Sequence, residues 1–125
     1  MPDVLVVDDE PTVCRTLARL FRSEGHDAVC ATGGEEALRF LDEDGRPKLI
    51  VLDVMMPGTD GLAVLRRCRA AGRTATIPIV MYSAIDDEAT RAEAMSLGAQ
   101  DYVTKAGGFD PLYRHVVQYL TGRLD

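Results

Sequence analysis

The chain has 125 residues, of which 46% are hydrophobic and 27% charged, and its net charge is −6. This length suffices for one sizeable core, so we expect residues 1–125 to form a single domain. No apolar run is long enough to cross a bilayer and no signal peptide begins the chain, which predicts a cytoplasmic protein without membrane insertion. The acidic balance argues against direct nucleic-acid binding, which depends on Lys and Arg, and favours a cation or a basic partner.

The cysteines and histidines carry little functional signal. Cys14, Cys30 and Cys68 are odd in number, widely spaced and without a CxxC pair, which predicts reduced core thiols. His26 and His115 stand alone, so a metal site built on histidine is not expected.

Short apolar runs alternate with helical periodicity along the chain. The first strand is expected at Val4–Val7, and the helix after it starts near Pro11 and ends at Gly25. The other strands are expected at Ala28–Ala31, Leu49–Val54, Ile77–Met81 and Asp101–Thr104. The other helices are expected from Glu35 to Leu41, from Leu62 to Gly72, from Asp86 to a stop at Gly98, and, after a cap at Asp110 and Pro111, through Leu120.

Five successive β-α units predict an α/β fold, a doubly wound five-stranded parallel sheet of the flavodoxin-like kind with helices on both faces. The first, third and fourth strands are continuous apolar runs, as expected of central strands that are buried on both faces. The second and fifth strands then lie at the edges, which gives the strand order 2-1-3-4-5.

Polar side chains follow four of these strands. Asp8 and Asp9 follow the first strand, Asp53 lies near the end of the third, Ser83 follows the fourth and Lys105 the fifth. Each alone has an ordinary explanation as a helix cap, a turn former or a solvated charge. Ligands of such sheets bind outside the carboxyl ends of the strands, so the combination, in this order, predicts a functional site.

The three carboxylates suggest a metal ion. Like charges at one edge of a sheet repel and raise one another's pKa unless a cation is present. Mg²⁺ fits such a set, because it binds a few carboxylates and keeps several waters.

Four segments carry a resemblance that covers the whole chain. They are VLVVDDE at 4–10, LDVMMPGTDG at 52–61, VMYSA at 80–84 and GAQDYVTK at 98–105. With these segments the sequence resembles the receiver domains of two-component response regulators, and in particular the chemotaxis-regulator-like single domains.

The resemblance implies a role for each site residue. Asp53 would be the phosphoacceptor, taking phosphate from a histidine kinase, a phosphotransfer protein or a small phosphodonor. Asp8, Asp9, Asp53 and the backbone carbonyl of Met55 would hold Mg²⁺. Ser83 and Lys105 would neutralise phosphoryl oxygens, since phosphoryl transfer asks a protein mainly for alignment and charge neutralisation. The only chemistry would be the chain's own phosphorylation and dephosphorylation, so no enzyme in the usual sense is expected.

The resemblance also implies a switch. Once phosphate is present, Ser83 is drawn toward it and Tyr102 turns inward, which reshapes the surface of the fourth helix, fifth strand and fifth helix. An ordinary half-buried aromatic on an edge strand is the competing interpretation of Tyr102.

Two features depart from the family pattern or tune it. Family members usually carry a cis proline after the lysine, whereas Ala106 stands here, and a cis bond before a non-proline residue costs about 2.5–4 kcal/mol. We therefore expect a trans peptide and a loose loop around Lys105. Met55 and Ile85 occupy the two positions that flank the path of hydrolytic water in this family, and apolar Ile85 predicts slow self-dephosphorylation.

Other functions share parts of this pattern. A flavin binder of the same fold needs a first loop that attracts phosphate, which Asp8 and Asp9 repel. A phosphatase of the haloacid dehalogenase type needs a second acid where Met55 stands. A degenerate receiver that only binds proteins stays open because of the altered Lys105 loop.

The residues after the expected fifth helix leave no room for an output domain. The chain is therefore expected either to act alone on a downstream protein target or to be one domain of a longer protein with a fused output domain, such as a hybrid kinase or a transcription factor.

Overall fold

The computed structural model describes residues 2–43 and 45–122, and it contains one parallel sheet between two layers of helices. The strands are β1 (Val4–Val7), β2 (Ala28–Ala31), β3 (Leu49–Leu52), β4 (Ile79–Ser83) and β5 (Asp101–Thr104). The helices are α1 (Pro11–Ser23), α2 (Gly34–Glu43), α3 (Gly61–Ala70), α4 (Glu88–Ser96) and α5 (Phe109–Thr121), with a 3₁₀ turn, η1 (Lys105–Gly107), before α5.

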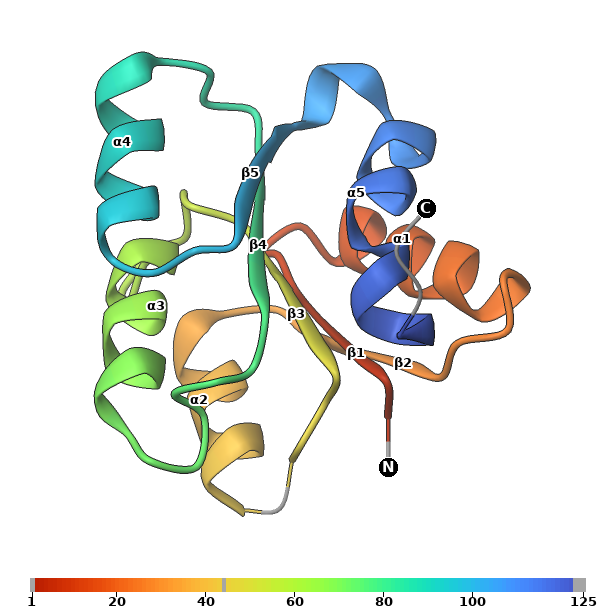
Figure 1. The fold of residues 1–125 in the computed structure, drawn as a ribbon, viewed down its shortest axis with the longest axis horizontal. Coiled ribbons are helices and arrows are strands. Elements are labelled where there is room, and N and C mark those ends of the chain that lie inside the picture. The colour runs from red at the N-terminus through yellow and green to blue at the C-terminus, as the bar shows by residue number, and fades with distance from the viewer. Residues whose placement is uncertain (1, 44, 123–125) are drawn as a thin grey trace.

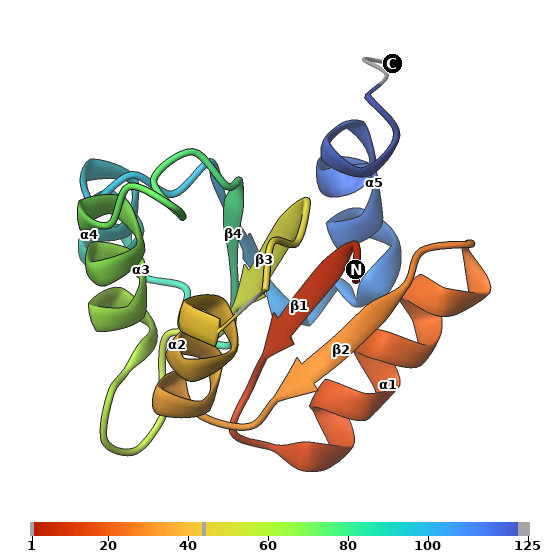
Figure 2. The ribbon, with the colours of Figure 1, turned by 90° about the horizontal axis from the view of Figure 1, so that it is seen from below.

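The strand order is β2-β1-β3-β4-β5, with all pairs parallel, so the predicted fold class and order are confirmed. Helices α2, α3 and α4 cover one face of the sheet, and α1 and α5 cover the other (Figure 1). The second view shows α1 alongside β1 and β2 at one side of the sheet (Figure 2). Both edge strands are therefore the ones that the sequence predicts.

Alternation along β1 explains why two cores form. Leu5 and Val7 pack in the cluster under α2, α3 and α4, whereas Val4 and Val6 pack with residues of α1 and α5. All four are buried, since side chains on successive strand residues point to opposite faces and both faces are covered. The continuous apolar run is the sequence signal of this two-sided burial.

Helix boundaries follow ordinary capping chemistry. The Asp60 carboxylate accepts the Ala63 N–H at 2.9 Å at the start of α3, and Asp87 accepts the Thr90 N–H at 2.7 Å at the start of α4. Gly98 follows α4 with φ 108°, as predicted for a helix stop.

The bounds of two strands differ from the predicted ones. β3 ends at Leu52, two residues short of the predicted Val54. β4 is shifted by two residues from the predicted Ile77–Met81, because Ile77 closes a turn with Thr74 while Ser83 continues the ladder opposite Thr104.

The last helix also begins differently. α5 begins at Phe109 after Gly108, whose φ of 77° suits glycine, and the predicted cap at Asp110 and Pro111 falls inside the first turn. Among the described residues no helix has both the length and the apolar content that crossing a bilayer requires.

Candidate functional site

The carboxyl ends of β1 and β3 bring three carboxylates together. β1 and β3 pair Val7 with Leu52, and the Asp53 N–H donates to the Val7 carbonyl at 3.0 Å, so Asp8 and Asp53 follow adjacent strand ends. One oxygen each from Asp8, Asp9 and Asp53 lies within 4.8 Å of the others. Asp8 is 2% exposed and Asp53 6%, so most of this charge lies away from water. The predicted convergence of the acids is confirmed.

Lys105 supplies the opposite charge from the far side of the site. Its Nζ donates to Asp8 Oδ2 at 2.6 Å and to Asp53 Oδ2 at 3.2 Å. The ammonium thus joins the end of β5 to the ends of β1 and β3. Two buried carboxylates share one cation, an arrangement in which each partner depends on the others.

Burial and charge act against each other at this cluster. Burial raises the pKa of Asp53, the Lys105 ammonium opposes this, and the Asp8 charge adds to the rise; the net direction is upward. Burial alone would lower the pKa of Lys105, but the hydrogen bond to Asp8 and the charges of Asp53 and Asp8 raise it overall. The raised pKa of Lys105 favours its charged form. The raised pKa of Asp53 means that its charged form is less favoured than that of a free carboxylate.

The loop after β3 fixes the position of Asp53. The Gly61 N–H donates to the Val54 carbonyl at 2.9 Å, which folds the loop back on itself at the start of α3. A Cβ on Gly61 would collide with the Asp53 backbone carbonyl, so only glycine permits this approach. A backbone hydrogen bond from Met55 reaches the Asp53 carboxylate and favours its charged form. Met55 therefore lies in the loop directly beside Asp53.

Ser83 lies at the end of β4, and Tyr102 lies within the neighbouring strand β5. Ser83 is the last residue of β4 and 1% exposed, and its Oγ accepts the Ile85 N–H at 3.1 Å. Tyr102 is 3% exposed, and its hydroxyl donates to the Ile85 carbonyl at 2.7 Å. Tyr102 is therefore buried rather than half-buried, and its hydroxyl is bonded.

Arg91 of α4 is a contact of Tyr102 that sequence reasoning missed. Its guanidinium carbon lies 4.9 Å from the centre of the Tyr102 ring, and its Nη1 donates to the Tyr102 carbonyl at 3.0 Å. A second guanidinium nitrogen lies 3.7 Å from Asp86. An arginine in an acidic helix has no sequence signal that separates it from a solvated charge; only the packing of α4 on β5 reveals this role.

The segment after Lys105 forms a turn. The described chain has no cis peptide bond, so the bond to Ala106 is trans as expected. Lys105–Gly107 form a 3₁₀ turn, and the Gly108 N–H donates to the Lys105 carbonyl at 3.0 Å; the looseness expected for this loop stays a prediction. This turn directs the ammonium to Asp8 and Asp53 without a proline.

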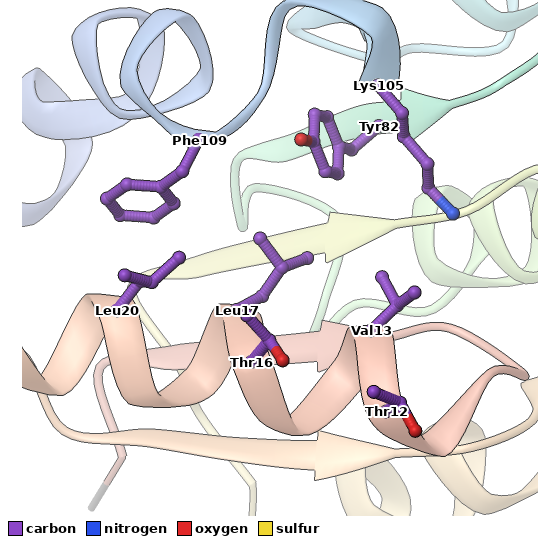
Figure 3. Close-up of a pocket in the computed structure, with 8 residues that line it drawn as sticks. All are labelled: Thr12, Val13, Thr16, Leu17, Leu20, Tyr82, Lys105 and Phe109. Carbon is purple, nitrogen blue, oxygen red and sulfur yellow. The ribbon is translucent and has the colours of Figure 1, made fainter.

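An apolar groove adjoins the site on the α1 side. Figure 3 shows it between α1 and the segment that carries Lys105 and Phe109, with Tyr82 at its upper wall. The groove has a volume of about 330 Å³, and the remaining lining comes from α1: Thr12, Val13, Thr16, Leu17 and Leu20. The stem of Lys105 therefore lines the groove while its ammonium binds the carboxylates, which connects the two.

Two of the three cysteines lie in the core as predicted, and both histidines contact other side chains. Cys14 and Cys68 are buried, Cys30 is half-buried, and all three are free thiols. His26 Nε2 lies 2.8 Å from the Tyr113 hydroxyl, and His115 Nδ1 lies 2.5 Å from an Asp101 carboxylate oxygen. Neither histidine belongs to the acidic cluster.

The site places the largely buried Asp53 carboxylate among groups that can neutralise anions. Three carboxylate oxygens within one short span suit a hard divalent ion with oxygen ligands. The buried hydroxyl of Ser83 and the Lys105 ammonium lie on neighbouring strands. Such a set can hold a phosphoryl group on Asp53.

Comparison with known proteins agrees with this chemistry. Residues 4–117 match the family model of the response regulator receiver domain. A response regulator receiver protein from Pseudomonas putida is 34% identical, with 94% of this chain and 96% of that chain covered and a TM-score of 0.87. The receiver domain of a signal transduction histidine kinase from Syntrophus aciditrophicus is 31% identical, with 100% and 96% covered and a TM-score of 0.87. A Thermotoga maritima response regulator solved in complex with Mg²⁺ and BeF is 35% identical, with 96% and 100% covered and a TM-score of 0.82.

The matched span includes the acidic pair, the loop after β3 and the segment that ends at Lys105. Receiver domains are signalling domains of two-component systems rather than enzymes in the usual sense, which disfavours the flavin-binding and phosphatase alternatives. The chain belongs to the response regulator receiver domain family.

Proposed function

We propose that Asp53 is phosphorylated in a Mg²⁺-dependent reaction and that this modification drives a conformational switch. The observation that carries the proposal is the position of Asp53: it is 6% exposed, 3.2 Å from Lys105 and clustered with Asp8 and Asp9. The phosphodonor is a histidine kinase, a phosphotransfer protein or a small acyl phosphate. The response reaches a downstream protein target or a fused output domain.

Each residue has a separate task in this reaction. A carboxylate oxygen of Asp53 forms a bond to phosphorus while the bond from phosphorus to the donor breaks, which leaves an acyl phosphate on the chain. The Lys105 ammonium, already at Asp8 and Asp53, lies ready to pair with a phosphoryl oxygen. Ser83 offers its hydroxyl as a further donor to a phosphoryl oxygen; at present its oxygen accepts the Ile85 N–H, and its side chain also hydrogen-bonds with Tyr102.

Asp8, Asp9, Asp53 and the Met55 carbonyl are the proposed Mg²⁺ ligands. When bound, the ion would neutralise the negative charge that accumulates on the transferring phosphoryl oxygens. The chemistry of the donor set supports this assignment, because carboxylate and carbonyl oxygens are the ligands that Mg²⁺ prefers.

The switch would pass from Ser83 to the surface of α4, β5 and α5. Movement of Ser83 toward phosphate would alter its bond to Ile85, whose carbonyl accepts the Tyr102 hydroxyl. Tyr102 in turn contacts Arg91 on α4. A charge event at Asp53 thus has a continuous set of contacts through which to bias this surface.

Mass spectrometry after incubation with acetyl phosphate and Mg²⁺ tests the proposal. We expect a mass gain of one phosphoryl group on the wild type and none on Asp53→Asn, because the amide is not a nucleophile for this transfer. Omission of Mg²⁺ is expected to abolish the gain as well. A wild type that stays unlabelled under conditions that label other receivers would favour a degenerate, phosphorylation-independent interaction module, a reading that the ordered Lys105 contact disfavours.

Slow self-dephosphorylation is a further expected result. Ile85 follows Ser83 by two residues and offers no polar side-chain group to orient water, while its backbone groups are engaged by Ser83 and Tyr102. In the Ile85→Gln variant, one added hydrogen bond to water should speed decay of the acyl phosphate about two- to tenfold. Decay is followed by intact mass after removal of the donor; wild-type decay as fast as in receivers with polar residues at both flanking positions contradicts the prediction.

A further inference from the structure

Met55 is exposed in a way that most large apolar side chains of this chain are not. It is 65% exposed, and among the described residues only Met95 joins it as an exposed large hydrophobic side chain, at 43%. Met56 is 7% exposed and Met81 is fully buried. A scattered exposed apolar residue is common by itself; what matters here is the place in which Met55 lies.

That place adjoins Asp9 of the acidic cluster. Met55 lines a hollow of about 410 Å³ together with Asp9, Met56, Pro57 and Asp60. Its backbone also hydrogen-bonds the Asp53 carboxylate. Met55 therefore lies at an exposed hollow that it shares with Asp9, while its backbone contacts Asp53.

A thioether in this position is chemically open to peroxide. In the reaction the Met55 sulfur gives two electrons to a hydroperoxide such as H₂O₂; one peroxide oxygen becomes bound to sulfur as the sulfoxide and the other leaves as water. The product is a polar group with a strong acceptor oxygen in place of a weakly accepting sulfur. A group of this kind can hold a water molecule where the thioether repels it.

We infer that Met55 is a redox-sensitive modification site whose oxidation to the sulfoxide shortens the life of the phosphoryl group on Asp53. The inference rests on the proposed phosphorylation of Asp53. It adds an input that reports peroxide at the hollow beside Asp9, without any change in the backbone carbonyl that Met55 offers to Mg²⁺ or in the side chains that carry the phosphoryl chemistry.

The test compares acyl phosphate decay before and after oxidation. Wild type, Met55→Leu and Met95→Leu are each treated with H₂O₂, the sulfoxides are mapped on peptides by mass spectrometry, and each sample is then labelled with acetyl phosphate and Mg²⁺. We expect Met55 to be oxidised ahead of Met56 and Met81. Decay should become about two- to tenfold faster on oxidation in wild type and in Met95→Leu, and should not change on oxidation in Met55→Leu.

The variants separate the possible outcomes. Met55→Leu keeps all three cysteines and the other methionines, so faster decay of its oxidised form would assign the effect to one of those residues and overturn the inference. Unchanged decay in oxidised wild type, with Met55 shown to be a sulfoxide, overturns it too, as does failure of Met55 to oxidise when Met95 does. If unoxidised wild type takes up no phosphate, the proposed function itself fails, and the inference with it. Treatment of oxidised wild type with methionine sulfoxide reductase should restore slow decay.

Discussion

Replacement of Lys105 by methionine is expected to lower the free energy of unfolding by about 2–3 kcal/mol at neutral pH without divalent ions. The change leaves Asp8 and Asp53, at 2% and 6% exposure, without the cation that both now bind. Removal of one partner from a buried ion pair costs several kcal/mol, and the partial exposure of the lysine reduces this figure. Urea unfolding at pH 7 measures the difference.

Lys48→Met is the matched control. Lys48 also pairs with an aspartate, Asp3, but at 3.7 Å and with 59% of its side chain exposed, so the same substitution should change stability by less than about 1 kcal/mol. A loss at Lys105 no larger than that at Lys48 would show that the buried cluster does not need its cation.

Addition of Mg²⁺ gives a second comparison of the Lys105→Met and Lys48→Met variants. A ligand that binds only the folded state stabilises it by mass action. The Lys105→Met protein should therefore regain stability with Mg²⁺, and by more than Lys48→Met does, because its carboxylates have no competing ammonium. Equal gains in both variants would argue that Lys105 and the metal do not share the Asp8 and Asp53 oxygens.

The sequence allowed the sheet and the acidic site to be predicted for the same physical reason. Strands buried on both faces must be apolar throughout, so β1, β3 and β4 stand out as runs, and the polar residues that end them mark the sheet edge. Asp8, Asp53 and Lys105 follow from chain order and strand direction alone. The two-residue error in β4 arose because Ile77 is apolar for another reason: it packs at the sheet margin while its N–H closes a turn with Thr74.

The contacts that long side chains make between helices and strands could not be predicted from the sequence. Arg91 reaches Tyr102 across the α4–β5 packing, and Arg69 of α3 donates to the carbonyls of Ile77 and Gly98. Neither arginine differs in local pattern from a solvated one. Nothing in the sequence indicated that a 3₁₀ turn of Lys105–Gly107, without a proline, directs the ammonium to Asp8 and Asp53.

Replacement of Asp53 by asparagine is expected to stabilise the fold at neutral pH, on the order of 1 kcal/mol, although it removes the proposed phosphoacceptor. Burial raises the pKa of Asp53 in the folded protein despite the opposing Lys105 charge, and the neighbouring Asp8 adds to the rise. An amide of the same shape avoids the desolvation of a charge and the repulsion by Asp8. A site arranged for phosphoryl transfer thus carries a cost in stability that the variant removes.

The pH dependence of the stability gained by Asp53→Asn shows whether the charge of Asp53 is its cause. Below the pKa of an unfolded aspartate, about 3.9, the carboxyl is protonated in both states and the two proteins should be equally stable. As pH rises from there through the raised pKa of folded Asp53, the unfolded chain releases its proton first, so wild-type stability falls relative to the variant. Above that folded pKa the difference should stay constant. Denaturant unfolding of both proteins between pH 4 and pH 8 should therefore give a gap that opens with rising pH.

Asp27→Asn, at an exposed carboxylate outside the site, is the control and should show little difference at any of these pH values. Mg²⁺ at pH 7 should narrow the gap between wild type and Asp53→Asn, because only the wild type keeps three carboxylates for the ion. A gap that widens toward acid, or that Mg²⁺ leaves unchanged, would mean that Asp53 is not the strained anion that its burial implies. The same result would mean that a cation is not needed to offset the unfavourable free energy of the Asp53 charge at this edge of the sheet.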